Sequence, residues 1–415
     1  MSKNNYKVNI GITCIFLAVT LSSSTVLGFP PDNAAVLYLR AFIVYEEPDN
    51  EDLSKMITDL QDGKIKPNDR IRQYFEKNRS VIELVTTASQ IPNCDWGRDH
   101  SKGFDLMMPE LATVRKLAFM LVADSKVYLN DGDYKTSLER CLTIHRMARH
   151  ISDDLIISNL VGVAMNGLAN KHIKIILSEM PADVESLQWL KNQMLDVSAK
   201  TPSLISAIRA EAEISLREIR KENTDKLLGY VNTEDIKVIR KADTDTTPSD
   251  GSAEEKKKKV YEENVEKLRN GDEEYFSQSR KYYMDFITSV KTAFALPYED
   301  AYRELEKLNE KIAKEAETNP AAFLTSHMSP MIAKLCTNEM VFKTNFNAVI
   351  TAIEIYIIKA KTGRLPDSLP AGLPKDLFSG KDFAYEKNAD GFILRCQGKD
   401  LDKNKIHEYE FKVKK

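Results

Sequence analysis

The sequence predicts a mainly α-helical protein with a small α+β module at its C-terminal end. Apolar residues recur at helical spacing through most of residues 30–220 and again between 260 and 361. Alternation of apolar and polar residues appears only after residue 380, around Asn388-Ala389-Asp390-Gly391, which is typical of a hairpin turn. With 415 residues, 42% of them hydrophobic and 29% charged, the chain is long enough for two or three domains and a sizeable core.

The first 28 residues have the pattern of a secretory signal peptide. Residues 8–21 carry no charge, Lys3 and Lys7 precede them, and a small-residue stretch ends at Gly28. The run is shorter than the roughly 20 apolar residues that cross a bilayer, so we expect cleavage after Gly28, export to the periplasm or cell envelope, and no membrane span in the mature chain. An uncleaved anchor is the alternative, and it also places the bulk of the chain outside the cytoplasm.

Charge and cysteine content narrow the function classes. Cleavage would remove two lysines and no acid, which changes the net charge from −3 to −5. Nucleic-acid binders need clustered basic residues, so no nucleic-acid partner is expected. Four cysteines then remain, at Cys94, Cys141, Cys336 and Cys396. They permit three disulfide pairings in an oxidising compartment, but wide separation and apolar surroundings equally suit buried thiols, and the pairing stays open.

Residues 29–220 are expected to form a helical body. A helix from Leu111 to Tyr128 and a second one from about Tyr134 flank the turn Asp131-Gly132-Asp133.

A central helix follows over residues 155–177, apolar almost all round, with Ser152 as its N-cap and two aspartates in its first turn. It should stop at Met180-Pro181, because the residue before a proline avoids the helical region. A last helix is predicted to start with Thr201 as its cap and Pro202 at its first position, and to run to about residue 220.

Residues 221–337 are expected to hold long helices joined by a charged, flexible linker near residues 243–259. This segment is almost free of apolar residues and cannot bury enough surface to fold alone. We expect a surface linker or a flexible hairpin, with the lysines of residues 256–259 as a solvated face; a polybasic partner site is the alternative, which the neighbouring acids oppose. Helix should resume near Val260, and a later helix should end at Asn319-Pro320.

Residues 338–415 should form the α+β module. A helix from about Asn338 to Lys361 ends before Gly363, which suits a left-handed C-cap. A proline-spaced loop, the hairpin and a third strand over residues 409–413 follow, and alternation in that strand predicts a sheet with one solvated face.

The helix pair from Ala118 to Arg149 resembles a single tetratricopeptide unit. Ser125, Tyr128 and Ser137 stand at small and aromatic positions of that repeat, and Gly132-Asp133-Tyr134 matches its turn. The resemblance implies helix-hairpin packing. A binding solenoid is the alternative, but stacking normally needs three or more units, and no neighbouring unit follows at a 34-residue period.

Residues 346–402 resemble the periplasmic head of type II secretion pseudopilins. An apolar helix, a G-x-x-P turn over residues 363–366, a P-x-D loop over residues 374–376 and a hairpin occur in the same order. The resemblance implies the fold of that head but not a filament subunit, because those proteins carry a glutamate near the start of the mature helix, where Asn33 stands in this chain.

Together with the sequence Cys94-Asp95-Trp96-Gly97 and the helix pair over residues 109–150, this module resembles a family of uncharacterised exported bacterial proteins. That resemblance implies an architecture and no particular activity.

The densest polar cluster lies between Cys94 and His100. With two nearby arginines it supplies the candidate binding residues, which are Cys94, Asp95, Trp96, Asp99, His100, Arg115 and Arg149. A nucleophilic Cys94 would need a base and an electropositive setting, and the sequence identifies no orienting partner, so no catalytic residue is assigned. In the alternative, structural interpretation, Trp96 lies between helices, Gly97 forms a turn, and Asp95 caps the next segment or pairs with Arg115 or Arg149.

Metal-binding patterns are sparse. His145 and His150 are five residues apart, which misses the spacing that puts two zinc ligands on one helix face. Asp400 and Asp402 offer oxygen ligands for calcium, and the pseudopilin head often holds calcium in the equivalent loop, but the chain lacks the fuller acidic set and a hydrated surface loop is favoured. No other cofactor is expected.

The sequence therefore predicts an exported, non-catalytic protein that binds other proteins or polymers of the envelope. It contains no G-x-S-x-G, no phosphate-binding glycine loop and no H-E-x-x-H. The alternative is a hydrolase of envelope glycan or peptide with the loop from Asp95 to His100 at its mouth. Calcium-dependent assembly through Asp400 and Asp402 is a third hypothesis.

Overall fold

The computed structural model describes residues 32–152, 155–232, 251–329 and 332–414. Helices make up most of this structure, and a three-stranded antiparallel sheet lies near the C-terminus. The predicted fold class, mainly α with a small C-terminal α+β module, is therefore confirmed. The predicted signal peptide (residues 1–28) and residues 243–250 of the predicted linker lie outside the described residues.

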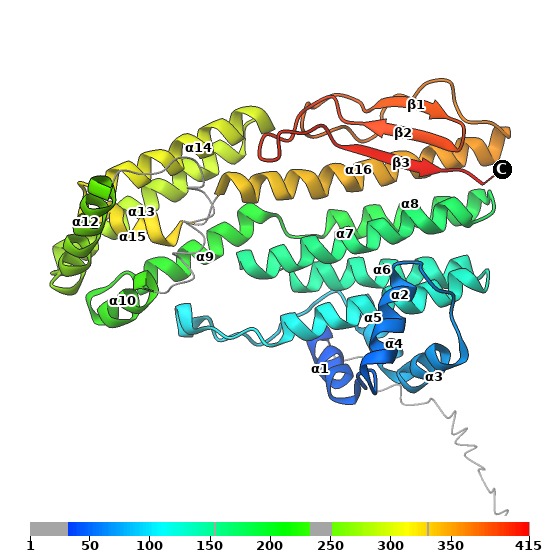
Figure 1. Ribbon diagram of the computed structural model, residues 1–415, viewed down its shortest axis with the longest axis horizontal. Helices are drawn as coiled ribbons and strands as arrows, with labels where there is room; N and C mark the ends of the chain where they lie inside the picture. The colour runs from blue at the N-terminus through cyan, green and yellow to red at the C-terminus, as the bar shows by residue number, and fades with distance from the viewer. Residues whose placement is uncertain (1–31, 153–154, 233–250, 330–331, 415) are drawn as a thin grey trace, which may run out of the picture.

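Four helices form the N-terminal corner of the molecule (Figure 1), and they are α1 (Ala34–Val44), α2 (Glu51–Gln61), α3 (Asp69–Lys77) and α4 (Arg79–Gln90). Asparagine side chains at the N-caps of α1, α2 and α3 accept hydrogen bonds from the first-turn amides. The fully buried Asn78 ties α3 to the segment after α1, because its side chain accepts from Glu46 N and donates to Glu46 O, both at 3.1 Å.

The predicted hairpin consists of α5 (Glu110–Asn130) and α6 (Tyr134–Ile151). Gly132 has a φ of 79° in the connecting turn, a conformation that favours glycine. The buried hydroxyl oxygens of Ser125 and Ser137 lie 2.8 Å apart across the two helices. The small residues that the sequence placed at these positions therefore allow close packing.

The central layers are arranged around two long helices. α7 (Ile156–Glu179) packs on α5 and α6, α8 (Val184–Ala199) packs on α6, and α16 (Ile332–Thr362) packs on α7 and α8. Figure 1 shows the sheet on the opposite side of α16 from α8. α7 ends one residue before Met180-Pro181, as predicted.

Two predicted helix starts are wrong. Ser152 is the residue after the end of α6, and α7 begins at Ile156. α9 (Leu204–Glu218) begins after Ser203 rather than at Thr201-Pro202. Its first amide is satisfied from another helix, because Glu339 of α16 accepts a hydrogen bond from Leu204 N at 3.1 Å. Local spacing cannot reveal a cap that comes from a residue so distant in the sequence.

Gly162 lies where α7 passes closest to the end of α6. A Cβ at this position would lie 1.8 Å from Ser152 Oγ and 2.8 Å from Ala148 O. We expect Gly162→Ala to lower the free energy of unfolding by about 1–3 kcal/mol, because the helices would have to separate. Gly167→Ala on the same helix is the matched control, since nothing lies within 4 Å of its Cβ, and it should be neutral or stabilising. Urea denaturation measures both, and equal stabilities would argue against the close approach.

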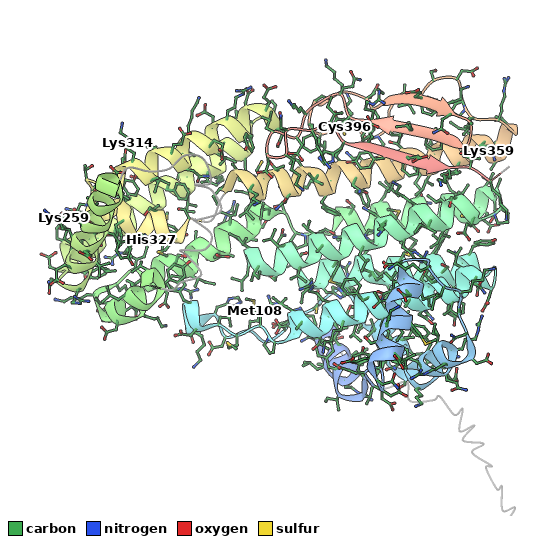
Figure 2. The ribbon with its side chains drawn as sticks, in the orientation of Figure 1. Met108, Lys259, Lys314, His327, Lys359 and Cys396 are labelled. Atoms are coloured by element: carbon green, nitrogen blue, oxygen red, sulfur yellow. The ribbon has the colours of Figure 1, made fainter. Side chains whose placement is uncertain are left out.

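A second core lies at the other end of the molecule, at the left of Figure 1. It is formed by the end of α9, α10 (Thr224–Asn232), α12 (Gly251–Arg269), the first part of α13 (Glu273–Phe294) and α15 (Pro320–Met328). The same part of the chain holds the short η2 (Lys221–Asn223) and α14 (Tyr298–Glu315). The ring of His327, labelled in Figure 2, packs 4.4 Å from that of Phe323. α14 and the end of α13 instead join the main core, so residues 221–337 do not form one separate unit.

The predicted linker near residues 243–259 is wrong in its second half, because α12 already begins at Gly251. Glutamate and lysine are good helix formers, and acidic residues four positions before lysines support a helix. A run of charges between residues 254 and 259 has a composition that suits a helix as well as a loop, so composition alone does not distinguish the two.

The C-terminal sheet has the order β1 (Ala384–Asn388), β2 (Gly391–Arg395) and β3 (Glu408–Lys412). Asn388 pairs with Gly391 across the predicted hairpin, and Gly363 after α16 has the predicted positive φ, at 77°. Burial alternates along β3, so one face of that strand is solvated. The buried ring of Phe392 lies 5.7 Å from that of Tyr356 on α16, which fixes the sheet on that helix.

The stretch Pro320–Thr362 is long and apolar enough to cross a membrane by length and composition. Most of it is buried against other elements of the fold. A core helix passes the same test, and α16 has that role in this structure.

Candidate functional site

The predicted cluster between Cys94 and His100 folds into a turn followed by the 3-10 helix η1 (His100–Asp105). Asp95 Oδ1 accepts a hydrogen bond from Gly97 N at 2.8 Å, and Asp99 Oδ1 accepts one from Ser101 N at 3.1 Å. The contacts with Ser101 lower the pKa of Asp99. Both carboxylates therefore cap local turns.

Trp96 connects α1 to the end of α6. Its ring stacks on those of Tyr38 and Phe42, with centroids 5.4 and 6.2 Å away. Its Nε1 donates to His150 O at 2.9 Å. This geometry supports the structural interpretation of Trp96.

Of the two candidate arginines, Arg115 and Arg149, it is Arg149 that lies close to Trp96 and Tyr38, through its contact with His150. Its Nη2 donates to His150 Nε2 at 2.6 Å, which leaves the Nδ1 proton of His150 for Tyr38 Oη at 3.0 Å. Burial and then the charge of Arg149 lower the pKa of His150 to about 3. Cys94 lies close enough to affect the pKa of both Tyr38 and Arg149.

The seven candidate residues thus do not converge on one pocket. Cys94, Trp96 and Arg149 meet around Tyr38, whereas Asp99 and His100 belong to η1. Arg115 is exposed on α5, and its side chain makes no ion pair or hydrogen bond to any residue that the structure describes. Asp95 forms no ion pair with Arg115 or Arg149 in the described structure. Its carboxylate instead accepts a hydrogen bond from Gly97 N.

The two aspartates proposed for calcium differ in their surroundings. Asp400 is fully buried, and its oxygens accept from Lys403 N at 2.9 Å and contact His407 Nε2 at 2.8 Å, whereas Asp402 is exposed. Within the described ranges no group of three or more His, Cys, Asp or Glu side chains is arranged to hold a metal. The geometry gives the calcium hypothesis no support.

The cysteines form no disulfide in the described structure. Burial raises the pKa of Cys141 and of Cys336 to about 12, and that of Cys396 is raised as well. These three residues are therefore neutral buried thiols, one of the two possibilities that the sequence left open.

A different site is built where α6, α7, α8 and α16 meet. A cavity of about 290 Å³, which we call the polar cavity, lies between them. Amides, hydroxyls, one imidazole, one ion pair and two phenyl rings contribute to its lining, including His145, Ser152, Asn159, Asn166, Ser203, Glu339, Phe342, Lys343, Phe346 and Leu377.

His145 is the most unusual group in this lining. Its Nδ1 lies 2.6 Å from Asn166 Oδ1, an acceptor, so Nδ1 carries the proton and Nε2 is an acceptor. That Nε2 is buried and makes no hydrogen bond of good geometry to a described residue, and neither do the polar atoms of Asn170, whose side chain nevertheless lies close enough to raise the pKa of His145. Burial lowers the pKa of His145 to about 4, although contacts with Asn166 and Asn170 oppose this. The imidazole is neutral at neutral pH.

Glu339 and Lys343 form the charged part of the lining. Glu339 Oε1 accepts from Leu204 N and lies 2.9 Å from Lys343 Nζ. The carboxylate is thus held by the N-terminus of α9, where negative charge is stabilised. Glu339 is only 8% exposed, whereas the Lys343 side chain is 43% exposed.

The C-terminal module closes the polar cavity through the loop between α16 and β1. Leu377 of this loop lies in the lining, and Asn347 of α16 donates to Lys375 O at 2.8 Å. The fully buried Asp376 fixes the loop, because its carboxylate accepts four hydrogen bonds, which come from Phe378 N, Ser379 Oγ, Gln397 N and Gly398 N at 2.6–2.9 Å.

Sequence reasoning missed this site although a signal was present. Asn159, Asn166 and Asn170 lie at spacings of seven and four on a helix whose first half is mostly apolar, so they share one face. Polar residues aligned on a buried helix face are costly unless they are paired. The contribution of α16 and residue 377 could not be seen, because these residues are far away in the sequence.

Comparisons of the chain with protein-family models, with curated proteins and with solved structures find no match. The resemblances to tetratricopeptide units, pseudopilin heads and exported bacterial proteins therefore stay predictions, and the role of the polar cavity has to be argued from its own chemistry.

Proposed function

We propose that the chain is an exported binding protein of the cell envelope whose polar cavity takes a sugar residue of an envelope polymer. The observation that carries this proposal is a cavity of about 290 Å³ lined by neutral hydrogen-bonding side chains, with the neutral imidazole of His145 among them. Ligand sites are commonly concave, with volumes from about 300 Å³ and a few convergent polar groups. A cavity of about 290 Å³ suits one small ring.

The lining matches a sugar in its chemistry. Sugar hydroxyls both donate and accept hydrogen bonds, so they can pair with the amide of Asn159 and with the hydroxyls of Ser152 and Ser203 in the lining. Phe342 and Phe346 offer apolar surface for the C–H groups of the ring.

Binding without turnover is supported by the single carboxylate in the described lining, that of Glu339. Glycoside hydrolysis usually requires two carboxyl groups on either side of the bond. The Glu339 carboxylate is, in addition, held by Leu204 N and Lys343 Nζ.

Export is proposed on the uncharged run of residues 8–21 and the small residues before Gly28. Cell fractionation and sequencing of the mature N-terminus test it, with Phe29 expected as the first residue. Recovery of the unprocessed chain from the cytosol would contradict it.

The binding proposal is tested by calorimetric titration of the full mature chain with methyl glycosides of glucose, galactose, mannose and N-acetylglucosamine at millimolar concentrations. We expect one or more to bind, and His145→Leu to weaken that binding about tenfold or more, because leucine removes a polar group from the lining and leaves Asn166 Oδ1 without its donor. His172→Leu is the matched control, because His172 is an equally buried histidine on α7, with a pKa lowered to about 3 by burial, that does not line the cavity.

The pH dependence adds a second readout. Because the pKa of His145 is about 4, the ring stays neutral from pH 8 to 5, and the affinity should fall only as a buried charge forms in the lining near pH 4. Failure of every glycoside to bind, or equal affinities of the two histidine variants, would overturn the proposal.

A further inference from the structure

A second cavity adjoins the polar cavity. It has a volume of about 160 Å³ and shares Ser203, Glu339 and Lys343 with the lining of the polar cavity. We call it the apolar cavity, because its other lining residues are Ile205, Phe294, Leu296, Tyr298, Ala301, Cys336 and Met340.

The few polar atoms in this lining are already engaged or neutral. Tyr298 Oη lies 3.0 Å from Thr337 Oγ1 and accepts a hydrogen bond from Leu401 N at 3.0 Å. Burial keeps the Cys336 thiol protonated by raising its pKa to about 12. The apolar cavity therefore offers mainly the ring of Tyr298 and aliphatic surface to an occupant.

Two of the residues that line both cavities are the ion pair of Glu339 and Lys343. Glu339 is fixed by the N-terminus of α9. Lys343 is 43% exposed, and its long stem can move while its ammonium group stays in water. A ligand bound beside Lys343 can therefore contact the linings of both cavities.

We propose that the apolar cavity is a second subsite of the same ligand and takes an alkyl or acyl group attached to the sugar. The ligand class is thus an amphipathic glycoside, with its sugar beside His145 and its apolar group beside Phe294 and Tyr298. This inference rests on the proposed function, since it assigns the sugar to the polar cavity.

The probes are methyl, butyl and hexyl β-D-glucoside, titrated below their micelle concentrations into the full mature chain. Burial of a methylene group in an apolar site strengthens binding about fourfold. We expect affinity to rise by about that factor per methylene and to level off once the cavity is filled.

Leu296→Glu places a charge at the apolar cavity and should remove this gain while methyl glucoside still binds. Leu195→Glu is the matched control, because Leu195 is equally exposed, at 41%, and lines neither cavity. It should keep the gain.

The outcomes separate the two proposals. If methyl glucoside binds but chain length has no effect, or if Leu296→Glu keeps the gain, the second subsite is wrong and the sugar site stands. If none of the four methyl glycosides binds to the wild-type chain, both are overturned; if another sugar binds but the glucosides do not, the alkyl glycosides of that sugar are titrated and judged by the same outcomes.

Discussion

Asp376→Ala should be the most damaging single substitution in the C-terminal module, with a loss of about 4 kcal/mol or more in the free energy of unfolding. The fully buried carboxylate is the acceptor for three backbone amides and one hydroxyl. Alanine would leave these donors buried without it, at about 1–3 kcal/mol each. Chemical denaturation of the full chain measures the effect, and hydrogen exchange should show it in the loops over residues 374–381 and 396–398.

Two further substitutions control this prediction. Asp376→Asn keeps the shape and one acceptor oxygen, so its loss should be intermediate. Asp367→Ala removes an aspartate of the same segment that is 89% exposed and pairs with Lys387, which should cost less than about 1 kcal/mol. A stability of Asp376→Ala within that same margin would refute the assigned role. Because Leu377 borders the polar cavity, Asp376→Ala should also weaken sugar binding.

Arg140→Met should destabilise the α5–α6 hairpin by about 3–5 kcal/mol. Arg140 Nε lies 2.6 Å from Asp124 Oδ2, and the two side chains are 15% and 6% exposed. The substitution would leave the Asp124 charge buried without its cation. Thermal and chemical denaturation measure the loss, and the double variant Asp124→Leu/Arg140→Met should recover most of it, because replacing both charges removes the uncompensated one.

The pH dependence of this variant has a defined sign. Burial already raises the pKa of Asp124 in the wild-type chain, with Arg140 opposing the rise. Without Arg140 the pKa should rise further, so the folded state binds a proton more readily than the unfolded one, and the deficit should shrink as pH falls. Arg72→Met is the control, since its pair with Asp131 is 40% exposed on both sides, and it should cost less than about 1 kcal/mol. A deficit independent of pH would contradict this account.

The fold was largely predictable because its signals are local. Helical periodicity identified α5, α6 and α7, and Gly132 and Gly363 occupy the left-handed positions expected of a turn and a helix end. The hairpin between β1 and β2 followed from its turn residues. The start of α9 could not be predicted from local signals, because its first amide donates to Glu339, a residue 135 positions further along the chain.

The candidate site was much less predictable. Neighbours in sequence drew attention to the segment from Cys94 to His100, but its side chains serve local turns and the contact of Trp96 with α1. The polar cavity joins His145 to Phe346, 201 positions further along, with their rings 6.4 Å apart. Proximity of this kind depends on how α16 packs, which no short pattern in a single sequence encodes.

α16 also determines how the chain can be divided. A boundary between residues 337 and 338, where the sequence suggested one, falls within this continuous helix of 31 residues. Residues 338–415 made on their own would lack Ile332, Ala333 and Cys336. A fragment that ends at residue 337 would expose to water the apolar surfaces of α7 and α8 that α16 covers. Neither fragment would contain all the residues that line the polar cavity or the apolar cavity. The roles of these cavities should therefore be tested by point substitution rather than by truncation.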